Sequence, residues 1–449
     1  MANPMANPQL ESWPRRPEAA RFFRSTLDGF AHDNPPIRAL AQRLLSDAGI
    51  DLGVLVDHWV LPANFEANLM GIGMERMVTD HGDEYWKHLS ARLPRVRTDD
   101  SLPTPQLAIG VENVDLFVRA NQLSPHLHAG DPGSEYEEAR CRMASGELVV
   151  VSRRGYDGFR PGTLSMAAAN DIEEARKAFR SRQRSGDEAI VQRRARITIE
   201  TAAGALGVNR AVDEFFAVER EFYMTRNRAA RWQFGVQQRL GLGWSNHDHH
   251  TYRSSRTGFR GLMDLWRRLG FMTRERFYAG AEAGWGAQIL EHPVSRVILF
   301  CDLDLAPDEL SLDFEGEDLL QIPALGTIGL WCELHGSSIA CAGMHHLEAE
   351  YDFDHVRELL NTAGFAMMPP FTDLPMLKQV FTEPEIWPVA CARVETLLNA
   401  GSITPGQAAR FRTHGAAGSH LEVLQRWEGF KGFNKTGVSA VIRDTDARG

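Results

Sequence analysis

Hydrophobic and polar positions follow a fixed order between residues 241 and 305. A polar, histidine-rich segment (247–250) precedes an amphipathic stretch (258–269) whose apolar residues recur with the period of a helix. Gly270 follows this stretch, as a glycine commonly follows the end of a helix. Three segments rich in aliphatic and aromatic residues then predict strands over 271–278, 284–290 and 294–303. The expected order is a strand, a helix and a small antiparallel meander.

A similar order occurs a second time further along the chain. Two segments over 328–334 and 339–344 are predicted as strands, and His345-His346 follows them. A predicted helix over 353–362 comes next and again ends near a Gly-Phe pair. The two units form a degenerate internal repeat in which each copy carries histidine at the same point. Two facing copies would bring two imidazoles together, and one carboxylate would complete the two-histidine-one-carboxylate set that holds iron(II) and leaves positions open for substrate and O2.

The region before these units is expected to be mainly helical and carries no chemistry-bearing motif. Residues 1–16 contain prolines and a repeated MANP, which predicts disorder. The histidine pair His126 and His128 has no matching carboxylate and is more typical of a solvated loop than of a metal site. Helices are predicted over 18–30, 36–48, 80–93, 169–184, 187–202 and 210–239, a strand with a short helix over 107–121, and a helix or strand pair over 55–73.

Three parts of the chain are therefore predicted. Residues 1–16 form a disordered N-terminus, 17–205 a mainly helical region, and 206–449 the metal-binding catalytic region. The role of the second part stays open between a lid, a dimerisation element and an additional degenerate module. The chain has 449 residues, of which 43% are hydrophobic, and can therefore bury a large core.

Charge and cysteine content exclude several classes of function. The formal net charge of −10 argues against general binding to nucleic acid or to anionic membranes. No apolar run approaches the roughly 20 residues that a membrane helix needs, and the N-terminus has no signal-peptide pattern. Five cysteines without CxxC spacing indicate reduced thiols in a cytoplasmic protein.

Glu395 and the C-terminal tail can each be interpreted in two ways. Glu395 is flanked by apolar residues, so it is either a half-buried structural residue or a metal ligand. The tail from residue 427 is rich in glycine and aromatic residues and is ordered only if it packs back on the core.

Four short stretches from about residue 243 onwards carry a family resemblance. They are His249-His250-Thr251-Tyr252-Arg253 before a helix and Phe277-Tyr278; His346-Leu347 before Asp352-Phe353-Asp354; Glu395 nine residues before Thr404-Pro405; and Trp427-Glu428-Gly429-Phe430 through Gly437-Val438-Ser439. In this order they resemble the 2-oxoadipate dioxygenase/decarboxylase (hydroxyglutarate synthase) family, non-haem iron enzymes of the vicinal oxygen chelate (VOC) type.

The resemblance implies a fold, a metal site and a reaction. The fold would be α+β, with paired VOC-like βαβββ modules forming a curved mixed sheet around the metal. Iron(II) would be held by His249, His346 and Glu395, and Arg253 would bind a substrate carboxylate. The implied reaction is oxidative decarboxylation or hydroxylation of a small 2-oxo acid or amino-acid-derived carboxylate with O2. A homodimer is compatible with this expectation.

Several points remain open at this stage. His249 and His250 face opposite sides of a strand, so one of them is the ligand, and the same choice applies to His345 and His346. His247, His250 and His345 are also candidates to orient the ligands. The alternative role of Arg253 is a salt bridge with Asp248 or another neighbour.

The sequence also departs from the family's pattern in two places. About 240 residues precede the first motif, and Trp387-Pro388-Val389-Ala390 replaces a polar segment of the family, so the resemblance extends to the metal site more than to the substrate. Two other classes of function compete with the dioxygenase. They are a divalent-metal isomerase or lyase that does not use O2, and a metal-free protein that binds a small molecule.

Overall fold

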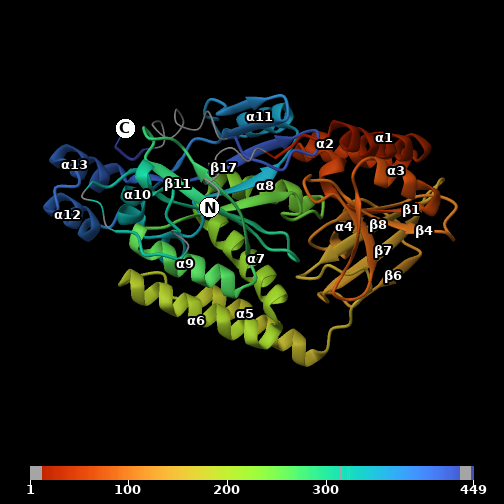
Figure 1. Ribbon diagram of the computed structural model, residues 1–449, viewed down its shortest axis with the longest axis horizontal. Helices are drawn as coiled ribbons and strands as arrows, with labels where there is room; N and C mark the ends of the chain where they lie inside the picture. The colour runs from red at the N-terminus through yellow and green to blue at the C-terminus, as the bar shows by residue number, and fades with distance from the viewer. Residues whose placement is uncertain (1–12, 314–315, 321, 323, 435–445, 449) are drawn as a thin grey trace, which may run out of the picture.

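Two curled mixed sheets, one in each half of the chain, form the frame of the computed structural model (Figure 1). The structure describes residues 13–313, 316–320, 322, 324–434 and 446–448. The N-terminal sheet has the strand order β2 (Glu75–Val78), β3 (Glu84–Lys87), β4 (Arg95–Asp99), β1 (Val56–Pro62), β5 (Gln106–Gly110), β8 (Glu147–Arg153), β7 (Tyr136–Arg142) and β6 (Leu127–Ala129).

The C-terminal sheet repeats this arrangement. Its order is β10 (Met272–Tyr278), β11 (Trp285–Glu291), β12 (Ile298–Asp304), β9 (His247–Arg253), β13 (His346–Glu350), β17 (Ala416–Arg426), β15 (Leu377–Phe381) and β14 (Thr372–Leu374), and β16 (Glu385–Trp387) pairs with β17.

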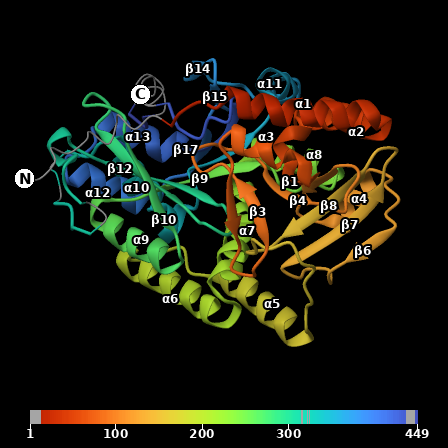
Figure 2. The ribbon, with the colours of Figure 1, turned by 45° about the vertical axis from the view of Figure 1, so that its right-hand side comes forward.

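Helices lie between and around the sheets. They are α1 (Pro17–Asp33), α2 (Pro35–Ala48), α3 (Glu66–Gly71), α4 (Val114–Ala120), α5 (Met166–Ser181), α6 (Glu188–Leu206), α7 (Val208–Arg226), α8 (Arg228–Arg239), α9 (Arg256–Arg268), α10 (Thr327–His335), α11 (Phe353–Thr362), α12 (Cys391–Asn399) and α13 (Pro405–His414). In both ribbon views α5 and α6 lie on the side of the molecule opposite α1 and α2 (Figures 1 and 2).

Each sheet consists of two βαβββ modules. In every module the first strand is followed by a helix and then by the remaining strands, and the last strand returns parallel to the first, as in β9–β12 and β13–β17. The N-terminal pairs β1–β4 and β5–β8 are parallel in the same way. First strands of neighbouring modules pair antiparallel, β9 with β13 and β1 with β5. The fold is therefore α+β with paired VOC-like modules, as expected, and the repeat has four copies where the sequence predicted two.

The first predicted unit is confirmed element by element. Its helix is α9, and the three predicted strands are β10, β11 and β12. The apolar face of α9 buries Phe259, Leu262 and Trp266 completely against the core. Gly270 takes a left-handed backbone conformation with φ of 78°, which lets the chain turn directly from α9 into β10.

Several predicted segments differ from the structure. The helix expected over 80–93 contains strand β3, and the middle of the mainly helical region is the eight-stranded sheet. These strands have only three to seven residues each, too few for a clear periodic pattern. The strands expected over 328–334 and 339–344 are α10 and a short π-helical turn (Ser338–Ala342). Nearly all of α10 is buried, and a helix that is apolar all round resembles a buried strand in sequence.

One hydrophobic core connects the two halves. It contains buried side chains from α1 and β1 in the N-terminal half, from α7 between the sheets, and from β9 and β17 in the C-terminal half. Phe216 of α7 illustrates the connection, because its ring contacts Tyr252 of β9 and Trp266 of α9. Cys141, Cys332, Cys341 and Cys391 are free thiols. Among the described residues, no helix is long and apolar enough to cross a membrane.

Candidate metal centre

Strand β9 presents His249 to the inner face of the C-terminal sheet. Side chains alternate along a strand, so His249, Thr251 and Arg253 share one face. His250 lies on the other face, where its ring centroid is 5.2 Å from that of Phe216 on α7. Of this pair, His249 is therefore the candidate ligand on the inner face.

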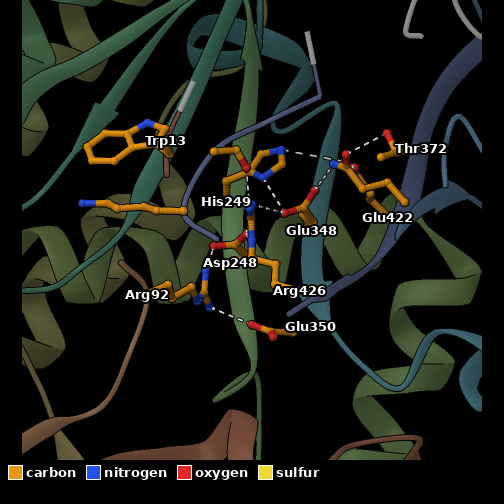
Figure 3. Close-up of polar contacts among 12 residues, drawn as sticks. Trp13, Arg92, Asp248, His249, Glu348, Glu350, Thr372, Glu422 and Arg426 are labelled. Atoms are coloured by element: carbon orange, nitrogen blue, oxygen red, sulfur yellow. Dashed lines mark hydrogen bonds and ion pairs between the residues drawn. The ribbon is translucent and has the colours of Figure 1, made fainter. Parts of the chain in front are cut away.

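Strands β13 and β17 bring His346 and Glu422 to the same point. His346 is in register with Thr251 on one side, and Glu348 is in register with Glu422 on the other. Nε2 of His346 lies 3.0 Å from Oε2 of Glu422, and Nε2 of His249 lies 3.8 Å from the same oxygen. One ligand atom from each of these three buried residues lies within 4.8 Å of the other two. In Figure 3 the side chain of Glu348 lies between those of His249 and Glu422.

Neighbouring polar groups hold the three side chains in place. Oε1 of Glu348 is 2.8 Å from Nδ1 of His249, an ion-pair contact on the side of the ring away from Glu422. Gln379 of β15 donates from Nε2 to a carboxylate oxygen of Glu348 and to Oε1 of Glu422, both at 3.0 Å. Oε2 of Glu422 is therefore the oxygen that faces the imidazoles.

The protonation states at this point favour a bound cation. Burial lowers the pKa of His346 well below its ordinary value, so its imidazole is neutral at neutral pH and one of its ring nitrogens carries a lone pair. Burial raises the pKa of Glu348 and of Glu422, and the charge of Glu422 raises the pKa of Glu348 further. A divalent cation would remove this penalty. The neutral imidazole of His346 beside these buried carboxylates therefore fits a metal ion.

A second group of potential ligands, Asp248, His249 and Glu348, lies beside the first. Asp248 is already bound by Arg92 and by Arg426, whose Nη2 is 2.9 Å from Oδ2 (Figure 3). The same guanidinium group of Arg426 is 3.7 Å from Glu348. Because arginines already neutralise these carboxylates, the set of His249, His346 and Glu422 is the better candidate.

The structure does not bring Glu395 to the two histidines. Glu395 lies on α12, its side chain is 52% exposed, and it pairs with Arg412 at 2.6 Å. The apolar neighbours Val394 and Leu397 point into the core and leave the carboxylate on the outer face of the helix. Glu422 therefore replaces Glu395 as the third candidate ligand.

Arg253 lies on the same face of β9 as His249 and is buried. Its Nε is 3.3 Å from Oδ2 of Asp302 on β12, and its guanidinium lies 5.3 Å from the ring centroid of Trp331. Burial raises the pKa of Asp302 to about 6, an effect that Arg253 partly offsets. The salt bridge that the sequence offered as an alternative role is thus present, with Asp302 as the partner in place of Asp248.

Aromatic rings enclose the candidate centre. The ring centroid of His249 lies 5.1 Å from Phe433 and 5.7 Å from Phe300, and that of His346 lies 5.1 Å from Phe381. Phe433 belongs to the C-terminal tail, so the described part of the tail packs back on the core. The tail motif at 437–439 lies outside the described residues, as do residues 1–12 of the N-terminus.

Glu422 and Glu348 are the two site residues that sequence reasoning missed. Glu422 belongs to Ser-His-Leu-Glu-Val, in which polar and apolar residues alternate as in a half-buried strand. Glu348 occurs in His-Leu-Glu-Ala, with the same alternation. A search for histidine or glutamate at alternate positions of the first and last strand of a module would have found both.

The other histidine pair does not form a metal site among the described residues. His128 lies on the exposed strand β6 and His126 directly before it, and they face Asp115 at 3.9 Å and Glu147 at 3.3 Å respectively. Their surface position agrees with the solvated interpretation.

Comparisons with known proteins give only distant similarities. No protein-family model matches the chain, and no curated protein matches it. Among solved structures, a 4-hydroxymandelate synthase mutant from Streptomyces coelicolor has 12% identity and a TM-score of 0.31, over 75% of this chain and 96% of that one. A putative hydrolase from Shewanella frigidimarina has 14% identity and a TM-score of 0.33 (47% and 91%). A methylmalonyl-CoA epimerase from Mycobacterium tuberculosis has 13% identity and a TM-score of 0.24 (40% and 88%).

Proposed function

We propose that the C-terminal half is a non-haem iron(II)-dependent dioxygenase that acts on a small 2-oxo acid or amino-acid-derived carboxylate. The observation that carries the proposal is the convergence of His249, His346 and Glu422 from three adjacent strands, with ligand atoms within 4.8 Å of one another. Two imidazoles and one carboxylate on one face of an ion are the ligand set typical of iron(II) oxygenases. Bound iron(II) would supply O2 activation and positions at which a substrate can chelate.

The surrounding residues would hold these ligands in one geometry. Glu348 fixes the orientation of the His249 ring through Nδ1, which leaves Nε2 directed at the metal position. Gln379 holds Glu422 through Oε1 and leaves Oε2 available. Because all of these groups are buried on sheet strands, the site is preorganised and loses little conformational entropy when a metal binds.

Arg253 would bind the carboxylate of the substrate. A buried guanidinium can form two parallel hydrogen bonds with a carboxylate, which orients the ligand as well as attracting it. Asp302 now occupies part of this guanidinium at 3.3 Å, longer than a typical charge-assisted hydrogen bond. A substrate carboxylate would therefore share the guanidinium with Asp302, and the rings of Phe300 and Phe433 would limit the access of water.

The test measures O2 consumption and CO2 release by the iron-loaded protein with a panel of 2-oxo acids and amino-acid-derived carboxylates. We expect coupled O2 uptake with at least one member, its loss in Glu422→Ala, and its retention in the matched surface variant Glu395→Ala. Metal-dependent turnover of a carboxylate without O2 would replace the proposal with an isomerase or lyase. A protein that binds no metal would favour the metal-free binding function.

A further inference from the structure

The inner face of the N-terminal sheet carries a cluster of arginines around one buried carboxylate. Nε of Arg153, at the end of β8, lies 3.0 Å from Oδ1 of Asp57. Arg95 of β4 lies 3.6 Å from the other oxygen, and Arg296, from the loop before β12, lies 3.8 Å from Oδ1. Three guanidinium groups thus surround a single carboxylate, so the cluster carries a surplus of positive charge.

Several donors of this cluster have no acceptor. Arg95 is 4% exposed, yet its Nε and Nη2 have no hydrogen-bond partner, and its Nη1 donates only to the carbonyl of Asp157 at 2.7 Å. Nη2 of Arg153 is also buried without an acceptor. Buried guanidinium donors without partners are costly, which points to an acceptor that completes the cluster.

A cavity gives a ligand access to these donors. It has a volume of about 1230 Å³, lies between the two halves, and is lined by Asp57, Arg95, Arg153 and Arg296. Lys87 at the end of β3 lines it as well, and the pKa of this amine is lowered by burial and then by the charge of Arg296. Positive groups from both halves therefore converge on one space large enough for a small organic molecule.

We propose that this cavity binds a small organic anion carrying a carboxylate or phosphate group, which is held by Arg95, Arg153, Arg296 and Lys87. Forked guanidinium donors match the oxygens of both groups, and a partly dehydrated cavity strengthens each charge-assisted contact. The four basic residues are not among the candidate metal ligands, and the proposal does not depend on the proposed dioxygenase activity.

Asp57 competes with such a ligand and provides a sensitive test. Although burial alone would raise its pKa, Arg153 and Arg95 hold the pKa of this carboxyl well below its usual range, so Asp57 is charged at neutral pH. It therefore neutralises part of the cluster and repels an incoming anion. Removing its charge would make the cavity a stronger anion site, an effect that a purely structural arginine cluster does not produce.

The experiment is a calorimetric titration of the full-length protein with sodium phosphate and with sodium succinate, at constant ionic strength. We expect saturable binding of at least one anion at one site per chain. Lys87→Gln and Arg296→Gln should each weaken it by about tenfold, since each removes one charge-assisted contact. Arg142→Gln, at the exposed end of β7 outside the cavity, is the matched control and should leave the affinity unchanged.

Two further variants complete the test. Asp57→Asn should bind the same anion at least about tenfold more tightly, because a competing charge is lost. Glu422→Gln, at the metal centre, should bind it as the wild type does. Binding of phosphate alone or succinate alone would assign the group that the site recognises. The proposal is overturned if neither anion binds, if Lys87→Gln and Arg296→Gln change nothing, or if a folded Asp57→Asn fails to bind more tightly.

Discussion

The two sheets have the same topology, but corresponding positions on their inner faces carry opposite chemistry. In each half, the first residue of a module's last strand pairs with a histidine on the module's first strand. Ile298 pairs with His249 in the C-terminal half, and Arg95 pairs with His58 in the N-terminal half. His346 and Gln106 are the first residues of the equivalent strands β13 and β5. Two residues further along, β13 pairs with Glu422 of β17, and β5 pairs with Val149 of β8. Glu422 in the C-terminal half therefore corresponds to Val149 in the N-terminal half.

This comparison shows how one fold can provide two kinds of site. The C-terminal face keeps two histidines and a carboxylate, a set suited to a cation. The N-terminal face keeps one histidine and has lost the carboxylate, while Arg95 and Arg97 stand where the other half has Ile298 and Phe300. The two proposed sites differ by the exchange of a carboxylate for valine and of apolar residues for arginines within the same arrangement of strands.

The largest expected effect comes from replacing Glu422 with valine, the residue at the corresponding position of the N-terminal half. Glu422→Val removes the only carboxylate of the ligand set, so we expect at least about a thousandfold loss of iron(II) affinity. Anaerobic calorimetry would measure the affinity, and near-UV circular dichroism would confirm that the variant is folded. Near-wild-type affinity in a folded Glu422→Val would show that the comparison assigns the wrong ligand.

The N-terminal half should show a distinct pH dependence. Burial lowers the pKa of His58 to about 4, although Asp57 acts in the opposite direction. Because the folded-state pKa is below the unfolded value of about 6.5, this histidine stabilises the fold above pH 6.5 and loses that contribution as the pH falls towards 4. We expect the apoprotein to lose up to about 3 kcal/mol more than His58→Gln over this range, measured by urea unfolding. Parallel curves for the two proteins would contradict the assignment.

A smaller effect is expected at the residue that orients His249. Glu348→Gln keeps the shape of the side chain but removes its charge beside Nδ1, and we expect iron(II) affinity to fall by about 10- to 100-fold. Glu350→Gln is the matched control on the same strand, because Glu350 pairs with Arg92 at 3.3 Å and has no place in the ligand set. Equal losses in both variants would indicate a general effect of charge and not an orienting role.

The smallest effect is expected at Glu395. Its exposed ion pair with Arg412 predicts that Glu395→Ala changes the free energy of unfolding by less than about 1 kcal/mol and leaves metal affinity unchanged. Thermal unfolding and metal titration would check both points. A large loss of metal affinity in this variant would restore Glu395 as a ligand and remove Glu422.

Strong local patterns made much of the C-terminal fold predictable. The apolar stripe of α9 and the residues of β10–β12 specify their elements without help from the rest of the chain. His249 and His346 could be found because a repeat places histidine at the same point of two modules. The short strands of the N-terminal sheet and the almost fully buried α10 lack such patterns, so their structure depends on tertiary contacts.

The rest of the two sites depends on long-range strand pairing. Glu422 is 76 positions after His346 in the sequence and meets it only because β17 returns beside β13. Arg95, Arg153 and Arg296 come from separate parts of the chain and meet at Asp57 only in the folded protein. Spacing to Thr404-Pro405 identified Glu395, but spacing alone does not reveal which face of a helix carries the carboxylate.

The most direct test of the central claim is anomalous X-ray scattering at the iron edge from crystals of the iron(II)-loaded protein. The account predicts a single strong peak per chain, about 2.0–2.2 Å from Nε2 of His249, Nε2 of His346 and a carboxylate oxygen of Glu422. A peak between Asp248 and Glu348, a peak on the N-terminal sheet, or no peak in fully loaded crystals would contradict it.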